Sequence, residues 1–342
     1  MKNPQCVRSL IPVLDVGRYF AGEGGALDLL AEELRYALEN VGFYYLCGHD
    51  VPLPMIESVF EQTARFHAMP LADKMVVKAN EHNVGYMPVN GYVSRSSRIS
   101  HSLKPNLVEA FFVKRELSSV HPDVRAGKRF RPLNQWPEKL PGFRDVVLAY
   151  CTAMESLCAR MLPVYARALE LNEDYFAKAF DDPQLTLRLS HYPPSELGES
   201  DQYGVAPHTD SSFLTMLAQS ELPGLSIRAS DGTWIDAPVL ENAFLVNSGD
   251  MLRRWTNHRF LSTPHYAINR TPARERYAIP FFFDANIDFP MECIETCCGP
   301  DNPPRYQPIT YAAYMEWFSH QYDHVREHIS SGAPTDPGVP DA

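Results

Sequence analysis

The pair His208 and Asp210 is the part of the sequence whose residue types and spacing best fit a chemical role. The two residues sit two positions apart in the segment Ala-Pro-His-Thr-Asp. In an extended strand, side chains at i and i+2 leave the same face, so an imidazole nitrogen and a carboxylate oxygen can converge on one cation. A second histidine, His265, follows in Ser-Thr-Pro-His-Tyr. These three residue types predict a metal site that leaves coordination positions open.

The spacing of His208 and Asp210 is informative only in its context. The chain has 12 histidines and 42 acidic residues among 342, so about one or two histidine-x-acid patterns are expected by chance. The other such pair, His121 and Asp123, has a proline at its centre, whose fixed φ splays the two side chains apart, and we expect a surface turn there. The residues after Asp210 read Ser-Ser-Phe-Leu-Thr-Met-Leu and favour a strand. Two histidines with one carboxylate form the ligand set of non-heme Fe(II) oxygenases.

Several motifs in a fixed order make the sequence similar to a known family. They are Ile11-Pro-Val-Leu-Asp15, Val41-Gly-Phe-Tyr-Tyr-Leu-Cys-Gly-His49, Leu187-Arg-Leu-Ser-His-Tyr192-Pro-Pro, His208-Thr-Asp210, Gly249-Asp250-Met-Leu-Arg-Arg-Trp255-Thr-Asn257, Ser262-Thr-Pro-His265 and Arg276-Tyr-Ala-Ile-Pro-Phe. The chain resembles the isopenicillin N synthase-like branch of the Fe(II)/2-oxoglutarate-dependent dioxygenases over roughly residues 10 to 320. The ordered series is far more specific than any one motif.

The resemblance implies a role for each site residue. His208, Asp210 and His265 would bind Fe(II), with neutral imidazoles and an ionised carboxylate. 2-Oxoglutarate would chelate the metal as co-substrate, dioxygen would take the remaining position, and succinate and carbon dioxide would be released as a small organic molecule is hydroxylated. Arg276 would bind the far carboxylate of 2-oxoglutarate, because guanidinium makes a two-pronged, permanently charged contact with a carboxylate. Tyr192 stands where a family tyrosine often donates to the same carboxylate.

Three residues depart from the family pattern. Ala278 stands where serine usually follows the arginine by two residues, Ser190 stands where asparagine is frequent, and Tyr266 follows the metal histidine where arginine is common. A hydrogen bond to a charged group contributes about 1.5 to 3 kcal/mol. The alanine at 278 therefore corresponds to roughly a ten- to hundred-fold loss of 2-oxoglutarate affinity unless another donor replaces the serine. Tyr192 is a candidate replacement.

Two other functions compete with a 2-oxoglutarate-dependent oxygenase. The first is an Fe(II)-dependent oxidase or cyclase of the same branch that takes its electrons elsewhere; Arg276 would then hold a substrate carboxylate, and Ala278 favours this possibility. The second is a non-catalytic ligand-binding protein on the same fold. The intact triad argues against the second, because an unused ferrous site has no reason to keep open positions. Hydroxylation, desaturation and ring formation share their first steps, so the sequence alone leaves the prime substrate and the outcome open, as it does the oligomeric state.

Composition restricts the classes of partner and compartment. A net charge of −11 argues against nucleic acid, which needs a basic face. The first residues, Met-Lys-Asn-Pro-Gln-Cys-Val-Arg, lack the apolar core of a signal peptide, and no uninterrupted apolar run reaches the length of a membrane span. We expect a cytoplasmic protein without a membrane partner, whose seven irregularly spaced cysteines stay reduced.

The order of elements predicts a mainly β fold with flanking helices. Short strands separated by turn signals are expected at 185–192, 205–210, 213–220, 225–228, 243–247, 262–269 and 276–283, which is typical of a sandwich or jelly roll. The resemblance implies a double-stranded β-helix with the iron near one mouth. We predict a dioxygenase-type α/β region at 1–120 with helices, helical support at 121–184, the jelly-roll core at 185–290, a C-terminal helical segment at 291–330 with a helix over 309–328, and a disordered tail at 331–342.

Overall fold

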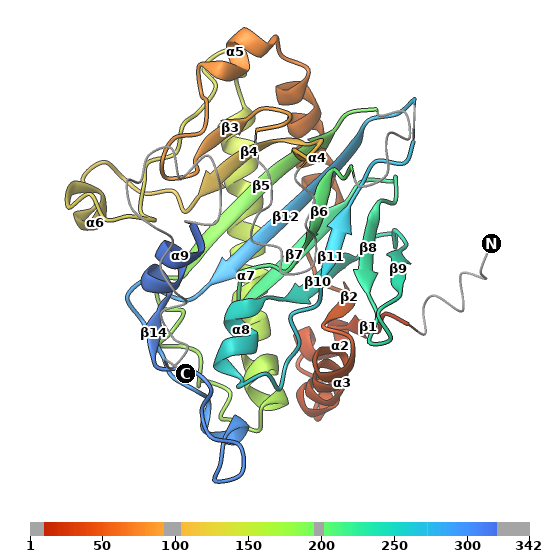
Figure 1. Ribbon diagram of the computed structural model, residues 1–342, viewed down its shortest axis with the longest axis vertical. Helices are drawn as coiled ribbons and strands as arrows, with labels where there is room; N and C mark the ends of the chain where they lie inside the picture. Colours follow the sequence, from red (N-terminus) through yellow and green to blue (C-terminus); the bar gives the residue numbers. More distant parts are fainter. Residues whose placement is uncertain (1–9, 92–103, 195–201, 272, 320–342) are drawn as a thin grey trace.

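Two β-sheets packed face to face form the centre of the molecule, and helices cover the outer face of the larger one (Figure 1). The computed structural model describes residues 10–91, 104–194, 202–271 and 273–319. The larger sheet has eight strands, in the order β1 (Val13–Asp15), β2 (Phe43–Cys47), β10 (Phe244–Ser248), β7 (Leu214–Gln219), β12 (Arg276–Asp284), β5 (Gln184–Tyr192), β4 (Glu109–Lys114) and β3 (Gly85–Met87). The smaller sheet has four, in the order β6 (Val205–His208), β11 (His265–Ala267), β8 (Leu225–Arg228) and β9 (Trp234–Ala237).

Apolar side chains from both sheets meet between them. This inner cluster includes Phe43, Leu217, Leu245 and Ala278 from the larger sheet and Val205, Leu225, Ile227 and Ala267 from the smaller one. Antiparallel sheets that share such an interior form the predicted jelly roll. All seven predicted strands are present, with ends that differ by up to three residues. β9 was not predicted, because it is a largely exposed edge strand with no clear apolar alternation.

The outer face of the larger sheet is covered by three long helices. α7 (Phe143–Ala168) packs against α3 (Ala26–Asn40), α4 (Leu53–His67) and β12. By length and composition alone α7 could cross a membrane. However, it contributes 13 buried residues to the main core. It is therefore the core helix of the fold.

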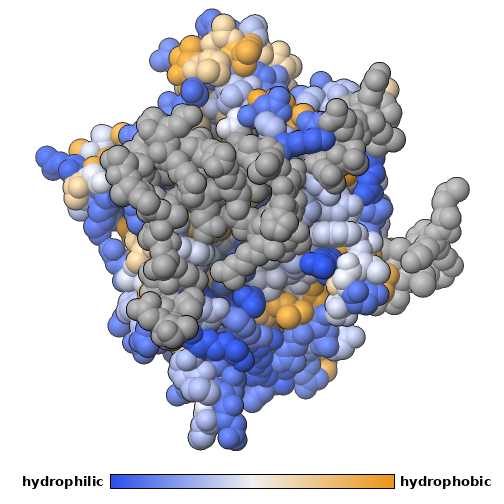
Figure 2. Space-filling view, viewed as in Figure 1, coloured by the Kyte–Doolittle hydropathy of each residue, from blue (hydrophilic) through white to orange (hydrophobic). Residues whose placement is uncertain are grey.

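The remaining helices are short. They are α2 (Gly17–Phe20), α5 (Leu71–Met75), α6 (Pro122–Arg125), α8 (Asp250–Trp255), the 3₁₀ turn η1 (Glu295–Cys297) and α9 (Tyr311–Ser319). Exposed apolar side chains on and after α5 form the orange patch at the top of Figure 2. His121 and Asp123 lie at the start of α6, where Nδ1 of His121 accepts the backbone N–H of Asp123 at 3.2 Å instead of facing a metal with it.

The C-terminal helix begins two residues later than predicted. Ile309 and Thr310 form β14 (Ile309–Thr310), which pairs with β13 (Pro290–Met291), so the helix starts at Tyr311. Residues 320–328 of the predicted helix and the predicted tail at 331–342 lie outside the described residues. The larger sheet takes β1 to β4 from the predicted N-terminal region and its other strands from the predicted core, so the two regions share one sheet.

The pairing of β12 with β5 decides which side chains face the inside of the barrel. Arg276 pairs with Tyr192, and Ala278 pairs with Ser190. Residues directly opposite each other in antiparallel strands share a face, and successive residues point to opposite faces. Ala278 and Tyr192 belong to the inner cluster, whereas Ile279 packs in the outer core with the helices. Arg276 and Ala278 therefore share the inner face of the barrel.

Candidate metal and co-substrate site

His208, Asp210 and His265 come together at the ends of two paired strands. His208 is the last residue of β6, and the antiparallel register sets it directly opposite His265, the first residue of β11. Asp210 follows two residues after His208. Its Oδ1 lies 3.5 Å from Nε2 of His208 and 3.6 Å from Nε2 of His265. One ligand atom from each residue thus falls within 4.8 Å of the others, close enough for a single ion to bind all three.

Backbone carbonyls orient both imidazole rings. Nδ1 of His208 lies 2.9 Å from the carbonyl oxygen of Ala206, and Nδ1 of His265 lies 3.1 Å from that of Thr263. A carbonyl oxygen can only accept, so each Nδ1 carries the proton and donates it. In the neutral ring, Nε2 then keeps its lone pair, which is the arrangement that metal-binding histidines use. Both Nε2 atoms face the carboxylate of Asp210.

Two neutral donors hold the Asp210 carboxylate. The Thr215 hydroxyl and the Asn247 amide each donate to Oδ2 of Asp210 at 2.8 Å, which leaves Oδ1 directed at the histidines. Thr215 on β7 and Asn247 on β10 are cross-strand partners, so the sheet register itself places both donors. Sequence reasoning missed them, because Asn247 is 37 residues from the carboxylate that it contacts.

The protonation states at the site suit a divalent cation. Burial by itself would raise the pKa of the Asp210 carboxyl, but His265, His208 and the hydrogen bond from Asn247 hold that pKa well below its usual range. Burial lowers the pKa of His265 to about 4. At neutral pH the carboxylate is therefore ionised and the His265 ring is neutral, as metal ligands must be.

Arg276 is a buried cation, and two of its donor atoms have no partner among the described residues. Its side chain is 0% exposed, and Nε and Nη1 have no hydrogen-bond partner among the described residues. Its Cζ lies 4.7 Å from the centre of the Tyr192 ring, so the predicted pair is assembled. A Cβ on Gly224 would lie 2.6 Å from Nε, so the absence of a side chain there makes room for the guanidinium. A buried guanidinium with two unused donors calls for an anion.

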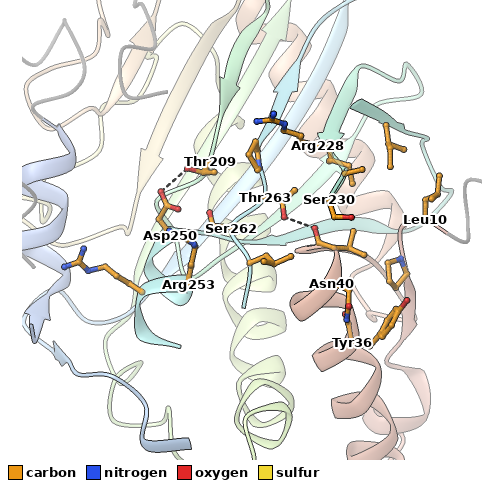
Figure 3. A pocket seen from close by; sticks show the side chains of 18 of the residues that line it. Leu10, Tyr36, Asn40, Thr209, Arg228, Ser230, Asp250, Arg253, Ser262 and Thr263 are labelled. Atoms are coloured by element: carbon orange, nitrogen blue, oxygen red, sulfur yellow. Dashed lines mark hydrogen bonds between the residues drawn. The ribbon is translucent and has the colours of Figure 1, made fainter. Parts of the chain in front are cut away.

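Two cavities adjoin the metal triad, and Thr209 lines both. The smaller, of about 160 Å³, reaches His208 and Asp210 and runs along the inner faces of β4, β5 and β12. The larger, of about 840 Å³, is the groove in Figure 3, where Thr209 donates to Asp250 at 2.9 Å. None of the three triad residues lines this larger groove. The smaller cavity is therefore the space in which a molecule would meet a bound metal.

A second cluster of possible ligands lies behind the barrel, where His67, Glu109 and His191 also come within 4.8 Å. Here Lys74 donates to Glu109 at 2.8 Å, Tyr86 donates to the same oxygen, and Nδ1 of His191 lies 2.7 Å from the other oxygen. The ammonium already neutralises the carboxylate, so a divalent ion would add two uncompensated buried charges. This cluster is a buried polar network, and strand alternation turns His191 away from the barrel interior that Tyr192 faces.

Comparison with known proteins agrees with this geometry. The model of the 2OG-Fe(II) oxygenase superfamily matches residues 183–285, and that of the non-haem dioxygenase in morphine synthesis N-terminal region matches residues 11–139. The 2-oxoglutarate-Fe(II) type oxidoreductase hxnY of Emericella nidulans is 33% identical over 307 residues, which cover 87% of this chain and 86% of that protein. The chain belongs to the 2OG-Fe(II) oxygenase superfamily. Clavatol oxidase claD of Penicillium crustosum is 30% identical, over 85% of this chain and 90% of that protein.

Solved structures of other proteins have a similar fold. A Neurospora crassa protein, solved at full length in complex with alpha-KG and 5-formyluracil, has a TM-score of 0.75 and 25% identity, over 88% of this chain and 93% of that one. As a 2OG-Fe(II) oxygenase, the protein described here uses Fe(II), 2-oxoglutarate and dioxygen. The predicted family, jelly-roll fold, enzyme class and cofactors are confirmed. The residues fit these groups: the triad offers two nitrogens and an oxygen, and Arg276 offers unused donors to a carboxylate.

Proposed function

We propose that the enzyme hydroxylates a small organic molecule in the 160 Å³ cavity. His208, Asp210 and His265 would hold the iron, and Arg276 and Tyr192 would hold the far carboxylate of 2-oxoglutarate. The observation that carries these assignments is a preformed triad together with a fully buried arginine on the same barrel interior, two of whose donors have no partner among the described residues. An oxidase that does not use 2-oxoglutarate would need a buried anion site only if its substrate carried a carboxylate.

The chain's own residues prepare the site for this reaction. Bound Fe(II) with 2-oxoglutarate and dioxygen supplies the oxidising chemistry and releases succinate and carbon dioxide. The triad keeps three ligand atoms on one face, because the β6–β11 pairing and the Thr215 and Asn247 donors fix their positions. Arg276, at a fixed distance along β12, sets the orientation of the co-substrate.

Two broader proposals accompany the assignment. We propose a cytoplasmic location, which is supported by the six described cysteines, all of which are free thiols. We also propose that the chain divides into regions at residues 120, 184, 290 and 330, as predicted, with the metal triad and Arg276 in the jelly-roll core.

The proposed roles are tested by turnover and metal content in variants of the triad. His208→Ala and Asp210→Ala should abolish succinate formation coupled to oxygen uptake, while circular dichroism shows the fold retained. Full turnover with bound iron lost would overturn the triad assignment. Thr209→Ala is the matched control, because Thr209 lies between the two ligands and donates to Asp250 instead.

A further inference from the structure

A buried hydroxyl on the inner face of the barrel has no hydrogen-bond partner. Ser190 lies on β5 two residues before Tyr192, so strand alternation puts both side chains on the inner face. The Ser190 side chain is 0% exposed, and its Oγ has no hydrogen-bond partner among the described residues. Burying a hydroxyl without a partner destabilises the folded protein, so this serine calls for an explanation.

The neighbouring strands offer this hydroxyl only apolar side chains. Ser190 lies opposite Ala110 in the β4–β5 pairing and opposite Ala278 in the β5–β12 pairing. Both alanines belong to the apolar inner cluster between the two sheets. A methyl group cannot accept a hydrogen bond, so neither neighbour satisfies the hydroxyl. A partner for it has to enter the barrel from outside the chain.

Two unpartnered donors of Arg276 lie one cross-strand pair away. Arg276 is opposite Tyr192 in the same pairing that sets Ala278 opposite Ser190. Arg276 and Ser190 are therefore diagonal neighbours on one face, a relation in which residues are about 7 to 8 Å apart. Nε and Nη1 of Arg276 have no partner among the described residues. Three donor atoms on two adjacent strands thus lack an acceptor at the same end of the barrel.

A carboxylate is the acceptor that suits these three donors. An ionised carboxylate only accepts hydrogen bonds, and its two oxygens have about four lone-pair sites. A guanidinium fills two of these sites with a two-pronged contact, which leaves others for a donor on the adjacent strand. We propose that Ser190 donates to the far carboxylate of 2-oxoglutarate, beside Arg276, and so supplies the donor that Ala278 lacks. This inference rests on the proposed function, which assigns that carboxylate to Arg276.

A bound water is the other partner that the hydroxyl could take. A water would satisfy Ser190 with or without 2-oxoglutarate, because a buried water forms hydrogen bonds to the protein alone. The proposed contact forms only when the co-substrate is bound. Removing the hydroxyl therefore affects the affinity for 2-oxoglutarate in the second case and not in the first.

Ser190→Ala tests the contact in anaerobic, Fe(II)-loaded protein titrated with 2-oxoglutarate. We expect roughly tenfold weaker binding, because a hydrogen bond to a charged group is lost. The affinity for Fe(II) should not change, and Tm without 2-oxoglutarate should equal or exceed that of the wild type, since the hydroxyl has no partner within the described chain to lose. Ser226→Ala is the matched control: this hydroxyl is equally buried but donates to Asp236 at 2.6 Å. The control should lose stability and keep its affinity for 2-oxoglutarate.

Two comparisons separate the proposed contact from a structural role. 2-Oxopentanoate keeps the chelating 2-oxo acid and has a methyl group in place of the far carboxylate, so Ser190→Ala should bind it like the wild type. Adding Ala278→Ser to Ser190→Ala moves a hydroxyl to the opposite strand, and it should restore most of the lost affinity for 2-oxoglutarate. A structural role of Ser190 predicts neither result.

Other outcomes overturn the inference. Wild-type affinity of Ser190→Ala for 2-oxoglutarate would show that the hydroxyl does not contact the co-substrate. An equal loss for 2-oxopentanoate would place the effect at the metal, and no recovery in the double variant would indicate damage to the barrel. Arg276→Met shows where a failure lies. If it binds 2-oxoglutarate like the wild type, the proposed function fails first; if it loses affinity and Ser190→Ala does not, only the role of Ser190 is wrong.

Discussion

Replacing Arg276 with methionine should separate co-substrate binding from folding. The Arg276 side chain is fully buried, Nε and Nη1 have no partner among the described residues, and burial lowers the pKa of the guanidinium. A buried cation without a counter-charge destabilises the folded protein. Methionine keeps an unbranched apolar chain and removes that charge. We therefore expect Arg276→Met, without 2-oxoglutarate, to unfold at the wild-type temperature or above it.

The same change should strongly weaken binding of 2-oxoglutarate. Removing one partner of a buried ion pair costs about 3 to 5 kcal/mol, and about 1.4 kcal/mol corresponds to a factor of ten. The dissociation constant should thus rise by roughly two to nearly four orders of magnitude. Affinity for Fe(II) should not change, because the triad takes no hydrogen bond from Arg276 among the contacts that hold it.

Calorimetric titration of anaerobic, Fe(II)-loaded protein measures the affinity, and thermal unfolding without 2-oxoglutarate measures the stability. Arg131→Met is the matched control, since Arg131 is equally buried but forms a 2.7 Å ion pair with Asp182. The control should lose stability and keep 2-oxoglutarate affinity. If Arg276→Met instead lost stability and bound 2-oxoglutarate like the wild type, Arg276 would be a structural residue and the reasoning would be refuted.

Three further changes test the surroundings of the site. Thr215→Val or Asn247→Leu should weaken Fe(II) binding about 10- to 100-fold, because the carboxylate of Asp210 would lose a donor that holds it in place. Equilibrium dialysis with Fe(II) measures this affinity. Wild-type affinity in both variants would show that the two donors do not position the carboxylate. Glu109→Gln should lower the free energy of unfolding in urea by about 3 to 5 kcal/mol, because Lys74 would stay buried and charged without its partner. The iron content should not change. Loss of iron would instead show that the second cluster is a metal site. Burial, and to a smaller extent the nearby arginines, lowers the pKa of His258 from 6.5 to about 4. Between these two values the unfolded chain binds a proton at His258 that the folded protein does not bind. The free energy of unfolding therefore falls as the pH drops through this window. His258→Gln should flatten that fall in Tm between pH 6.5 and 4, and an unchanged slope would contradict the assignment.

Much of the site follows from local patterns in the sequence. The i, i+2 spacing of His208 and Asp210 predicted their convergence, even though β6 ends at His208 and only the first of the two lies in the strand. The strand predicted at 276–283 is enough to put Arg276 and Ala278 on one face, because strand geometry fixes this alternation without reference to the rest of the fold. The approach of His265 followed from the family resemblance, since no local rule connects residues 57 apart.

The remaining features depend on which strands become neighbours. Ser190 and Ala278 are 88 residues apart in sequence, and only the β5–β12 register shows that one could replace the other. The same holds for Phe112 and Arg188, which face each other across β4 and β5. The network of His67, Glu109 and His191 joins a helix to two strands, and its members read individually as ordinary core or surface residues. Cross-strand register, which a single sequence specifies only weakly, carries this information.

The measurement that tests the central claim most directly is an anaerobic titration of the Fe(II)-loaded protein with 2-oxoglutarate, followed by visible absorption. Chelation of Fe(II) by 2-oxoglutarate should give a metal-to-ligand charge-transfer band that saturates at one equivalent in the wild type. The Arg276→Met variant should need far more 2-oxoglutarate for the same band, and His208→Ala should give none. Iron binding in the wild type without any such band would contradict the assignment of the triad and Arg276 to one 2-oxoglutarate site.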